Sequence, residues 1–379
     1  MKLKSLARLG ALLMAVLPPS VRAEITNAPA EKPSKYNVEI VAKGLANPWA
    51  LQFLPDGRML VTERPGRLRI ISADGKLSAP ITGVPKVVAR DQGGLLDVAV
   101  SPDFATTGTI FLSYSEPRDA MKNGTSVMRA KLILTAEGGS LQDGQVIFRQ
   151  LPAAASNHHF GSRLVINPDG SLFVTLGDRY SQRDQAQNPA NHIGKIVRIM
   201  QDGTPFAGNP KLPGWAPEVW SIGHRNVQGA ALDPVTGTLW TTEHGARGGD
   251  ELNNPQAGKN YGWPIISYGR DYTGEKIGIG TKKDGLEQPV YYWDPSIATS
   301  GLAFYTGHYS AWKNNAFAGG LAGMQIDRLV IRDGQVVAHE PLLAEKGWRI
   351  RDVRMGPGNA LYALTDESNG AVLRITPTQ

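Results

Sequence analysis

The stretch SNHHFGSR, residues 156–163, holds two neighbouring imidazoles in a chain that has seven histidines. Histidine changes its charge near neutral pH, so a positioned imidazole can take a proton from a substrate as a general base. Adjacent side chains of a strand, or of the segment leading into one, face opposite sides, so only one of His158 and His159 has to face a site. A lone histidine is more often structural, and these residues alone leave that alternative open.

Two arginines in WRIRDV, residues 348–353, are two positions apart and therefore point to one face of a strand. The guanidinium groups of Arg349 and Arg351 can each bind a carboxylate through paired hydrogen bonds. Together they suit a planar ligand with several carboxylates. The alternative is a solvated edge strand on which Asp352 and Arg354 are surface charges.

Two further clusters place polar side chains between glycines. GHRNVQG, residues 223–229, contains Arg225 and Asn226, an arrangement that also fits a plain turn. EHGARGGDELN, residues 243–253, supplies three carboxylates, which are Glu243, Asp250 and Glu251. Calcium prefers hard oxygen ligands, including backbone carbonyls that a glycine-rich turn can aim inward. The spacing is not that of an EF-hand, and an ordinary acidic loop is the alternative.

A repeated phrase indicates which elements must position these clusters. FLPDGRMLVTE from Phe53 and INPDGSLFVTLGD from Ile166 each join a proline-containing turn to a β-branched and aromatic strand. Five such phrases have prolines 47, 66, 66 and 123 residues apart, namely Pro55, Pro102, Pro168, Pro234 and Pro357. A degenerate unit, SGLAFYTGH at 300–308, fits into the last interval. The sequence therefore predicts an all-β fold, a propeller of six four-stranded blades, with five sandwich-like hairpin pairs as the rival.

The ends of the chain and the loops complete this picture. YNVEIV, from Tyr36 to Val41, alternates without a nearby hairpin partner, and we expect it to close the ring by pairing with the last blade after Arg374. In a propeller, loops from several blades converge on the mouth of the central channel. The scattered polar clusters are therefore expected to meet there.

Composition and the N-terminus limit the classes of partner. Residues 1–23 combine a basic start, an apolar run and a small-residue cleavage site, which predicts a secretory signal peptide followed by a single propeller domain at 24–379. Its removal lowers the formal charge by four, from +6 to +2, so a nucleic-acid partner has little support. No membrane span is expected, and the predicted location is the periplasm. The absence of cysteine excludes disulfides and thiolate ligands.

The clusters resemble those of the soluble quinoprotein glucose dehydrogenases, and most closely those of the PQQ-dependent aldose sugar dehydrogenases, over nearly all of the mature chain. The ordered set of motifs is specific, although each motif alone is weak. The resemblance implies a six-bladed propeller with pyrroloquinoline quinone (PQQ) at the channel mouth, Ca²⁺ beside it, and oxidation of aldose sugars at C1 to lactones. A Ca²⁺-dependent propeller lactonase and a non-enzymatic sugar-binding propeller are the alternatives.

The resemblance also assigns roles to residues. It makes His159 the base that takes the proton of the C1 hydroxyl while C1 delivers hydride to C5 of PQQ, and it puts Arg225 near the quinone oxygen that gains negative charge. The cofactor contacts that it implies are Gln92, Asn157, Arg225, Asn226, Leu321, Ala322, Gly323, Arg349 and Arg351. The Ca²⁺ ligands that it implies are the carbonyls of Gly245 and Ala246 and, for a second, structural ion, Glu251 and the carbonyl of Tyr261.

Two positions depart from the pattern of the family. Ala246 replaces a usual proline, which leaves a carbonyl ligand unaffected, and Ala322 stands at about the position of a lysine that contacts PQQ in relatives. We expect the backbone amides of Leu321 to Gly323 to substitute for this lysine, because exposed amides can bind an anion. The sequence leaves open the preferred sugar, the electron acceptor, and whether the protein is a monomer or a homodimer.

Overall fold

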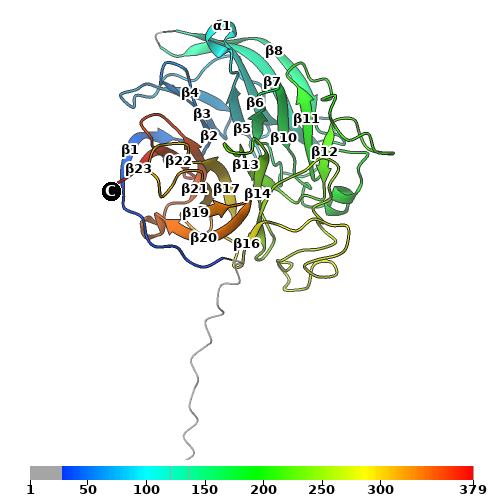
Figure 1. The fold of residues 1–379 in the computed structure, drawn as a ribbon. Coiled ribbons are helices and arrows are strands. Elements are labelled where there is room, and N and C mark those ends of the chain that lie inside the picture. Colours follow the sequence, from blue (N-terminus) through cyan, green and yellow to red (C-terminus); the bar gives the residue numbers. More distant parts are fainter. Residues whose placement is uncertain (1–27, 120, 136, 379) are drawn as a thin grey trace, which may run out of the picture.

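Six antiparallel sheets surround a common centre in the computed structural model, which describes residues 28–119, 121–135 and 137–378 (Figure 1). The predicted signal peptide, residues 1–23, lies outside the described residues. Within the described part of the chain, no helix has the length and apolar character needed to cross a membrane.

Each sheet is one blade, numbered here from 1 to 6 in chain order. Blade 1 consists of β2 (Pro48–Phe53), β3 (Met59–Glu63) and β4 (Arg67–Ile71). Blade 2 consists of β5 (Leu95–Val100), β6 (Thr109–Pro117), β7 (Asn123–Leu134) and β8 (Gly139–Arg149). Blade 3 consists of β9 (Leu164–Ile166), β10 (Ser171–Thr175), β11 (Lys195–Met200) and β12 (Val219–Ile222).

The second half of the chain forms the other three blades in the same way. Blade 4 consists of β13 (Val227–Leu232), β14 (Leu239–Glu243), β15 (Asp250–Asn253) and β16 (Tyr291–Trp293). Blade 5 consists of β17 (Thr299–Phe304), β18 (Ala316–Gly320), β19 (Gln325–Arg332) and β20 (Gln335–Leu342). Blade 6 consists of β21 (Ile350–Met355), β22 (Leu361–Thr365), β23 (Gly370–Pro377) and β1 (Tyr36–Leu45). Short helical turns occur at α1 (Phe104–Thr107), η1 (Arg183–Gln187) and η2 (Ala344–Lys346).

The blades close into a ring, which confirms the predicted six-bladed β-propeller. Their first strands contact one another in the order β2, β5, β9, β13, β17 and β21, and β21 contacts β2 again. The prediction of four strands in every blade is wrong for blade 1, which has three among the described residues. After β4, the chain makes only an isolated bridge between Ile71 and Leu77. Pro80 and Pro85 follow, and prolines lack the N–H that a strand ladder needs.

The N-terminal strand closes the ring as expected. β1 is the outer strand of blade 6 and pairs antiparallel with β23, with Tyr36 opposite Pro377 and Glu39 opposite Arg374. The pairing also extends upstream of Arg374, to Leu45 opposite Gly370. In Figure 1 the blue β1 accordingly lies beside the red β23, near the C-terminus.

The core consists of apolar layers between neighbouring blades. All five residues of β3, β10, β14, β18 and β22 are buried, because each of these second strands is covered by a blade on either side. Separate apolar clusters fill the interfaces between successive blades, including the one between blade 6 and blade 1. The repeated turn positions these strands: Gly57 and Gly170 end two of the turns with φ of +85° and +84°, a region that strains other residues.

A buried ion network crosses the channel between the inner strands. The Arg163 guanidinium lies 3.0 Å from Asp352 and 3.4 Å from Asp97, and Arg354 lies within 2.9 Å of both carboxylates. Asp352 is only 1% exposed. Asp352 is therefore buried and Arg354 is largely buried, and both are paired, unlike the surface charges of the solvated-edge alternative.

Candidate active site

The loop between β8 and β9 carries His159 into the channel mouth. His159 itself has a φ of +52°, and its N–H donates to the side-chain oxygen of Gln92 at 2.8 Å. The N–H of Gly161 donates to the side-chain oxygen of Asn226 at 3.1 Å. Gly161 has a φ of +64°, and a Cβ there would lie 2.7 Å from the Leu176 backbone, so this position requires glycine. Gln92 and Asn226, from blades 2 and 4, thus fix the His159 loop.

Asp178 orients the imidazole of His159. It follows β10, is fully buried, and lies 2.6 Å from His159 Nδ1, while its second oxygen accepts the indole N–H of Trp263 at 2.7 Å. Burial raises the pKa of Asp178, but the hydrogen bond with His159 and the charge of Arg225 hold it below its ordinary value. An ionised Asp178 accepts a hydrogen bond from Nδ1–H of His159, which leaves Nε2 as the basic nitrogen.

Burial and a nearby positive charge keep His159 neutral at pH 7. Burial of the ring lowers its pKa below the ordinary value, and Arg225 adds to this, while Asp178 acts in the opposite direction. The histidine lines a cavity of about 270 Å³ that also contacts Tyr180, Arg225, Ala246, Trp263 and Tyr272. A neutral imidazole that opens onto a cavity is the arrangement of a general base.

Neighbours of the histidine pair fill supporting positions. The ring of Tyr180 lies 5.4 Å from that of His159 and 5.7 Å from that of His158, so one tyrosine contacts both imidazoles. Asn157 accepts the N–H of Gln92 on its carbonyl at 3.1 Å and donates from its side chain to Asp91 at 3.2 Å. Gln92 and Asn157 therefore hold the loop, and their predicted contact with a cofactor stays a prediction.

Arg225 lines the same cavity as His159. Its guanidinium donates to the carbonyl of His244 at 3.1 Å, lies 3.5 Å from the hydroxyl of Tyr272, and its Cζ is 5.2 Å from the centre of the Trp263 ring. The backbone N–H of Arg225 donates to Glu243 at 2.7 Å. The predicted base and the predicted cation, 66 residues apart in the sequence, thus line one cavity.

Arg349 and Arg351 share one face, as strand parity predicts. Both approach the carboxylate of Asp366, at 3.5 Å and 2.9 Å, and Arg351 also donates to the side-chain oxygen of Gln228 at 2.8 Å. Burial raises the pKa of Asp366, but Arg351, Arg64 and Arg349 hold it below its ordinary value. More than one arginine thus acts on this single carboxylate.

His244 connects the two arginine groups. Burial, followed by the charges of Arg225 and Arg351, lowers the pKa of His244 to about 3. Arginines from the approach to β13 and from β21 therefore act on the same imidazole. Arg351 also donates to Gln228 of the GHRNVQG motif at 2.8 Å, so the two motifs meet as expected, and their binding of a cofactor stays a prediction.

The turn at Leu321–Gly323 does not behave as expected. The amides of Leu321, Ala322 and Gly323 donate to the carbonyls of Ile297 and Ala298 at 2.9–3.0 Å. The expectation that these amides are available to an anion is wrong, because the turn itself uses them. The carbonyl of Leu321 instead accepts a hydrogen bond from Arg349 at 3.1 Å, which places the turn beside the arginine pair.

The glycine-rich loop after β14 brings carboxylates together. Asn253 donates to Glu243 at 3.0 Å and to Glu251 at 3.1 Å, and burial, with the nearby Glu243, raises the pKa of Glu251 to about 8. Tyr261 stacks on His224 at 4.9 Å, and His224 lies 3.1 Å from Glu243. In the described segments, no cluster of three or more histidine or acidic side chains suits a metal. The predicted Ca²⁺ contacts depend on backbone carbonyls.

Gly245 and Ala246 follow in the same loop, and the glycine has no space for a side chain. A Cβ on Gly245 would lie 2.2 Å from the carbonyl of Gly248, while Ala246 lines the cavity. The N–H of Gly245 donates to Asp250 at 2.8 Å.

Several site residues escaped the sequence analysis. Asp178 is the chief one, although the phrase INPDGSLFVTLGD ends on it. The available signal was that other phrases also end on an acid, namely Glu63, Glu243 and Asp366. In the fold, Glu63 and Asp366 pair with arginine side chains, and Glu243 accepts the backbone N–H of Arg225. Trp263, Tyr272 and Gln228 had no such signal.

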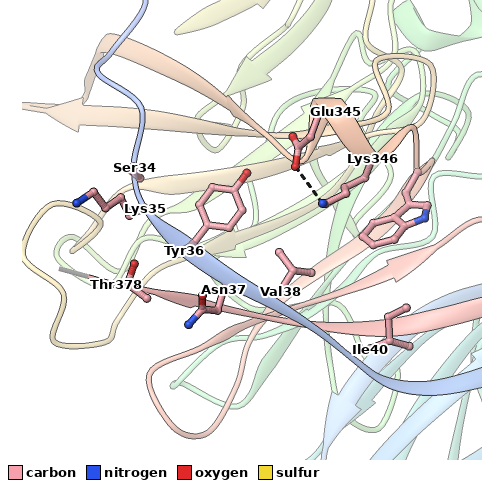
Figure 2. Close-up of a pocket in the computed structure, with 10 residues that line it drawn as sticks. Ser34, Lys35, Tyr36, Asn37, Val38, Ile40, Glu345, Lys346 and Thr378 are labelled. Atoms are coloured by element: carbon pink, nitrogen blue, oxygen red, sulfur yellow. Dashed lines mark ion pairs between the residues drawn. The ribbon is translucent and has the colours of Figure 1, made fainter.

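Larger hollows lie elsewhere on the molecule. A cavity of about 660 Å³ runs along the start of β1 beside η2, where Glu345 and Lys346 form an ion pair at 3.6 Å (Figure 2). None of the predicted catalytic, cofactor or metal residues lines it. The channel mouth, although smaller, contains the base and the cation and is therefore the candidate active site.

Known proteins share this architecture and much of this sequence. Residues 45–374 match the glucose/sorbosone dehydrogenase family. Aldose sugar dehydrogenase YliI of Escherichia coli K12 is 45% identical over 351 residues, which cover 91% of this chain and 94% of that protein. The apo crystal structure of the soluble aldose sugar dehydrogenase of Escherichia coli matches with a TM-score of 0.87 and 44% identity, over 91% of this chain and 100% of that one.

A third relative carries a cofactor in its structure. The PQQ-bound form of the aldose sugar dehydrogenase from Streptomyces coelicolor matches with a TM-score of 0.75 and 28% identity, over 91% of this chain and 100% of that one. The propeller fold and these relatives place the chain among the sugar dehydrogenases. This chain belongs to the glucose/sorbosone dehydrogenase family and is an oxidoreductase that acts on sugars.

Proposed function

We propose that this protein oxidises aldoses at C1 to lactones with PQQ and Ca²⁺ as cofactors, and that it passes the electrons to an external acceptor in the periplasm. The observation that carries the proposal is the neutral His159, held by Asp178, on a cavity that Arg225 also lines. The predicted signal peptide at 1–23 supports the location. The PQQ-bound Streptomyces coelicolor relative supports the cofactor.

Buried donors at the mouth fit a tricarboxylate such as PQQ. Within the described residues, Arg225 Nε, Asn226 Nδ2 and Arg351 Nε are buried and have no hydrogen-bond partner. A buried donor that stays unpaired costs free energy, so a group that brings acceptors to these atoms is stabilised there. Arg349 and Arg351 supply the positive charge that several carboxylates need.

The residues at the channel mouth would each have a distinct role in this reaction. When bound, PQQ supplies an acceptor for the hydride that leaves C1. Nε2 of His159 accepts the proton of the C1 hydroxyl, and Asp178 stabilises the imidazolium that forms. Arg225, which lines the same cavity, offers positive charge that would stabilise negative charge developing during the reaction.

Calcium fits the loop after β14 through oxygen ligands. The carbonyls of Gly245 and Ala246 are the proposed ligands beside PQQ, and Glu251 with the carbonyl of Tyr261 is the proposed structural site. The closeness of Glu243 and Glu251, which both accept hydrogen bonds from Asn253, favours a cation, because neighbouring carboxylates repel each other when both are ionised. Glu251→Gln is expected to abolish most of the rise in melting temperature that Ca²⁺ gives the apoprotein, whereas an unchanged rise would place the ion elsewhere.

The test is reconstitution of the apoprotein. Oxidation of aldoses with an artificial dye acceptor is expected only after addition of both PQQ and Ca²⁺, and a panel of aldoses then gives the preferred sugar. PQQ binding is followed independently through quenching of tryptophan fluorescence, since Trp263 lines the cavity. Activity with NAD alone, or hydrolysis of lactones with Ca²⁺ in the absence of PQQ, would contradict the proposal; the second result would support a lactonase.

A further inference from the structure

Arg179 is a fully buried guanidinium whose hydrogen bonds go to neutral oxygens. Among the described residues, its hydrogen-bond acceptors are Ser156 O, His158 O at 3.0 Å, Asn123 O at 3.3 Å and Asn123 Oδ1 at 2.7 Å. The residue is 0% exposed. A buried charge without a hydrogen-bonded anion is costly, so these contacts must fix something that the protein needs.

The contacts of Arg179 lie on both sides of His159. Its donors hold the carbonyls of Ser156 and His158, which precede His159, and its Cζ lies 3.9 Å from the centre of the Phe160 ring, which follows it. A cation over an aromatic face is a favourable contact when both groups are desolvated. One side chain thus holds the segment that carries the candidate base, before and after it.

The backbone of this segment needs an external restraint. His159 has a φ of +52° and Ser162 a φ of +86°, both in the left-handed region that non-glycine residues rarely adopt. Such backbone persists only where the surroundings over-determine it. Arg179 and Tyr180 themselves have φ of +56° and +61°, so the backbone directly after Asp178 is left-handed as well. In this conformation the side chain of Arg179 reaches the loop that carries His159.

We propose that Arg179 is a positioning residue for His159: it fixes the backbone on either side of the imidazole, while the adjacent Asp178 fixes the ring. The proposal rests on the proposed role of His159 as the base. Arg179 remains charged at neutral pH, because burial lowers its pKa only to about 9 and Asp178 partly offsets that effect. A displacement of about 1 Å at a reacting group costs up to roughly 10² in rate.

The central experiment compares Arg179→Met and Arg179→Lys with Arg198→Met. Arg198 is a matched control, because it is also buried and lies over aromatic rings, at 3.9 Å from Phe206, but it is paired with Asp169 away from the channel mouth. In Arg179→Met, kcat for dye-linked aldose oxidation is expected to fall by about 10- to 100-fold. The KM of the aldose and the Kd of PQQ should change less than threefold. Arg179→Lys should give an intermediate kcat, because an ammonium has fewer donors and cannot stack as a plane.

Two readouts separate positioning from a general loss of stability. Hydrogen exchange of the apoprotein should accelerate in peptides that span 154–163 in Arg179→Met, and not in Arg198→Met. A looser loop buries the imidazole less, so the pKa of His159 should rise and the acid limb of the kcat profile should move to higher pH. If Arg179→Met fails to fold, Phe160→Leu removes the stacking and should give a smaller change in the same directions.

Two results would overturn the inference. The first is wild-type kcat together with wild-type exchange in the 154–163 peptides of a folded Arg179→Met variant. The second is a loss that falls mainly on PQQ affinity, which would make Arg179 a cofactor cation. Failure of the proposed function is distinguishable from both results, because it would appear as the absence of PQQ-dependent activity in the wild type. The exchange experiment would still test whether Arg179 restrains the loop that carries His159.

Discussion

The molecule contains two histidines held in the same way by an aspartate and a tryptophan. At the channel mouth, Asp178 lies 2.6 Å from Nδ1 of His159 and accepts the indole N–H of Trp263 at 2.7 Å. At the outer edge of blade 5, Asp327 lies 3.2 Å from Nδ1 of His339 and accepts the indole N–H of Trp293 at 2.6 Å. Asp178 and Asp327 are both fully buried.

The two histidines differ in their backbone and in what lies beyond the aspartate. His339 belongs to the regular strand β20, opposite Leu329, and residues 29–31 cross it, with its N–H donating to the carbonyl of Pro29 and its carbonyl accepting from Glu31. His159 lies in a left-handed loop, lines a cavity and has Arg225 nearby. The comparison teaches that a carboxylate, itself held by an indole N–H, fixes the orientation of an imidazole. The cavity and the nearby cation are what allow the oriented imidazole to act as a base.

The largest difference in activity between His159 and His339 is expected when each imidazole is removed. His159→Ala should lower kcat by about 10² to 10⁴, the usual contribution of a positioned general base, while PQQ still binds. His339→Ala should leave kcat within about twofold and lower only the melting temperature. His158→Ala should lose much less activity than His159→Ala. A larger loss for His158 would mean that the assignment through HHFGSR is wrong by one residue.

Replacement of Asp178 and Asp327 tests the same comparison at the residues that orient the two imidazoles. Asp178→Asn is expected to lower kcat by about 10², because an amide can donate to Nδ1 and favour the tautomer with the proton on Nε2. Asp327→Asn should instead lower the free energy of unfolding by about 1–3 kcal/mol, the cost of a compromised buried hydrogen bond, with kcat nearly unchanged. Steady-state kinetics and chemical denaturation measure both quantities. Equal kinetic losses in the two variants would erase the distinction.

The cations that face the channel mouth are the second difference, and Ala322 probes them. The amides of its turn are already used, so Ala322→Lys should add a cation beside Arg349 and tighten PQQ by up to about tenfold. Turnover at saturating PQQ should change little. Met324→Lys, in the same turn and also exposed, is the control for charge alone and should give a smaller effect. Unchanged affinity in a folded Ala322→Lys variant would mean that this position does not face PQQ.

The smallest expected effect is on pH dependence. Because burial and Arg225 lower the pKa of His159, the imidazole stays neutral below the ordinary value of about 6.5, so the acid limb of kcat should lie below that pH. For stability, the unfolded chain then binds a proton that the folded chain does not. The contribution of His159 to the free energy of unfolding is therefore complete above about pH 6.5 and is lost as the pH falls from there through the lowered pKa. An acid limb above 6.5 would contradict this account.

Much of the architecture could be predicted because it is encoded within single blades. The prolines of the repeated turn, such as Pro55 and Pro168, and the strands that follow them define a blade through local turn chemistry and alternation. The shared face of Arg349 and Arg351 follows from strand parity in the same way. The number of strands in blade 1 was predicted wrongly, because its outer segment carries prolines and forms no fourth strand among the described residues.

The active site could be predicted only in part, because its decisive contacts join loop segments that are distant in the sequence. His159, Arg225 and Arg351 were found through their motifs, but nothing in the sequence near His159 shows that Asp178, 19 residues away, holds its ring. Nothing near Arg179 shows that its partners are at Asn123 and Ser156, and nothing near Leu321 shows that Ile297 and Ala298 use its turn.

The sequence by itself thus determined the repeat, the order of the blades and the residue types that reach the channel, since these depend on local backbone preferences and on side-chain alternation. Only the tertiary structure decided which histidine becomes a base. His159 and His339 each lie beside an aspartate that accepts an indole N–H, and they differ in what the packing of whole blades places around them. At the mouth, that packing leaves a cavity and a cation; at the edge of blade 5, it lays residues 29–31 across the strand.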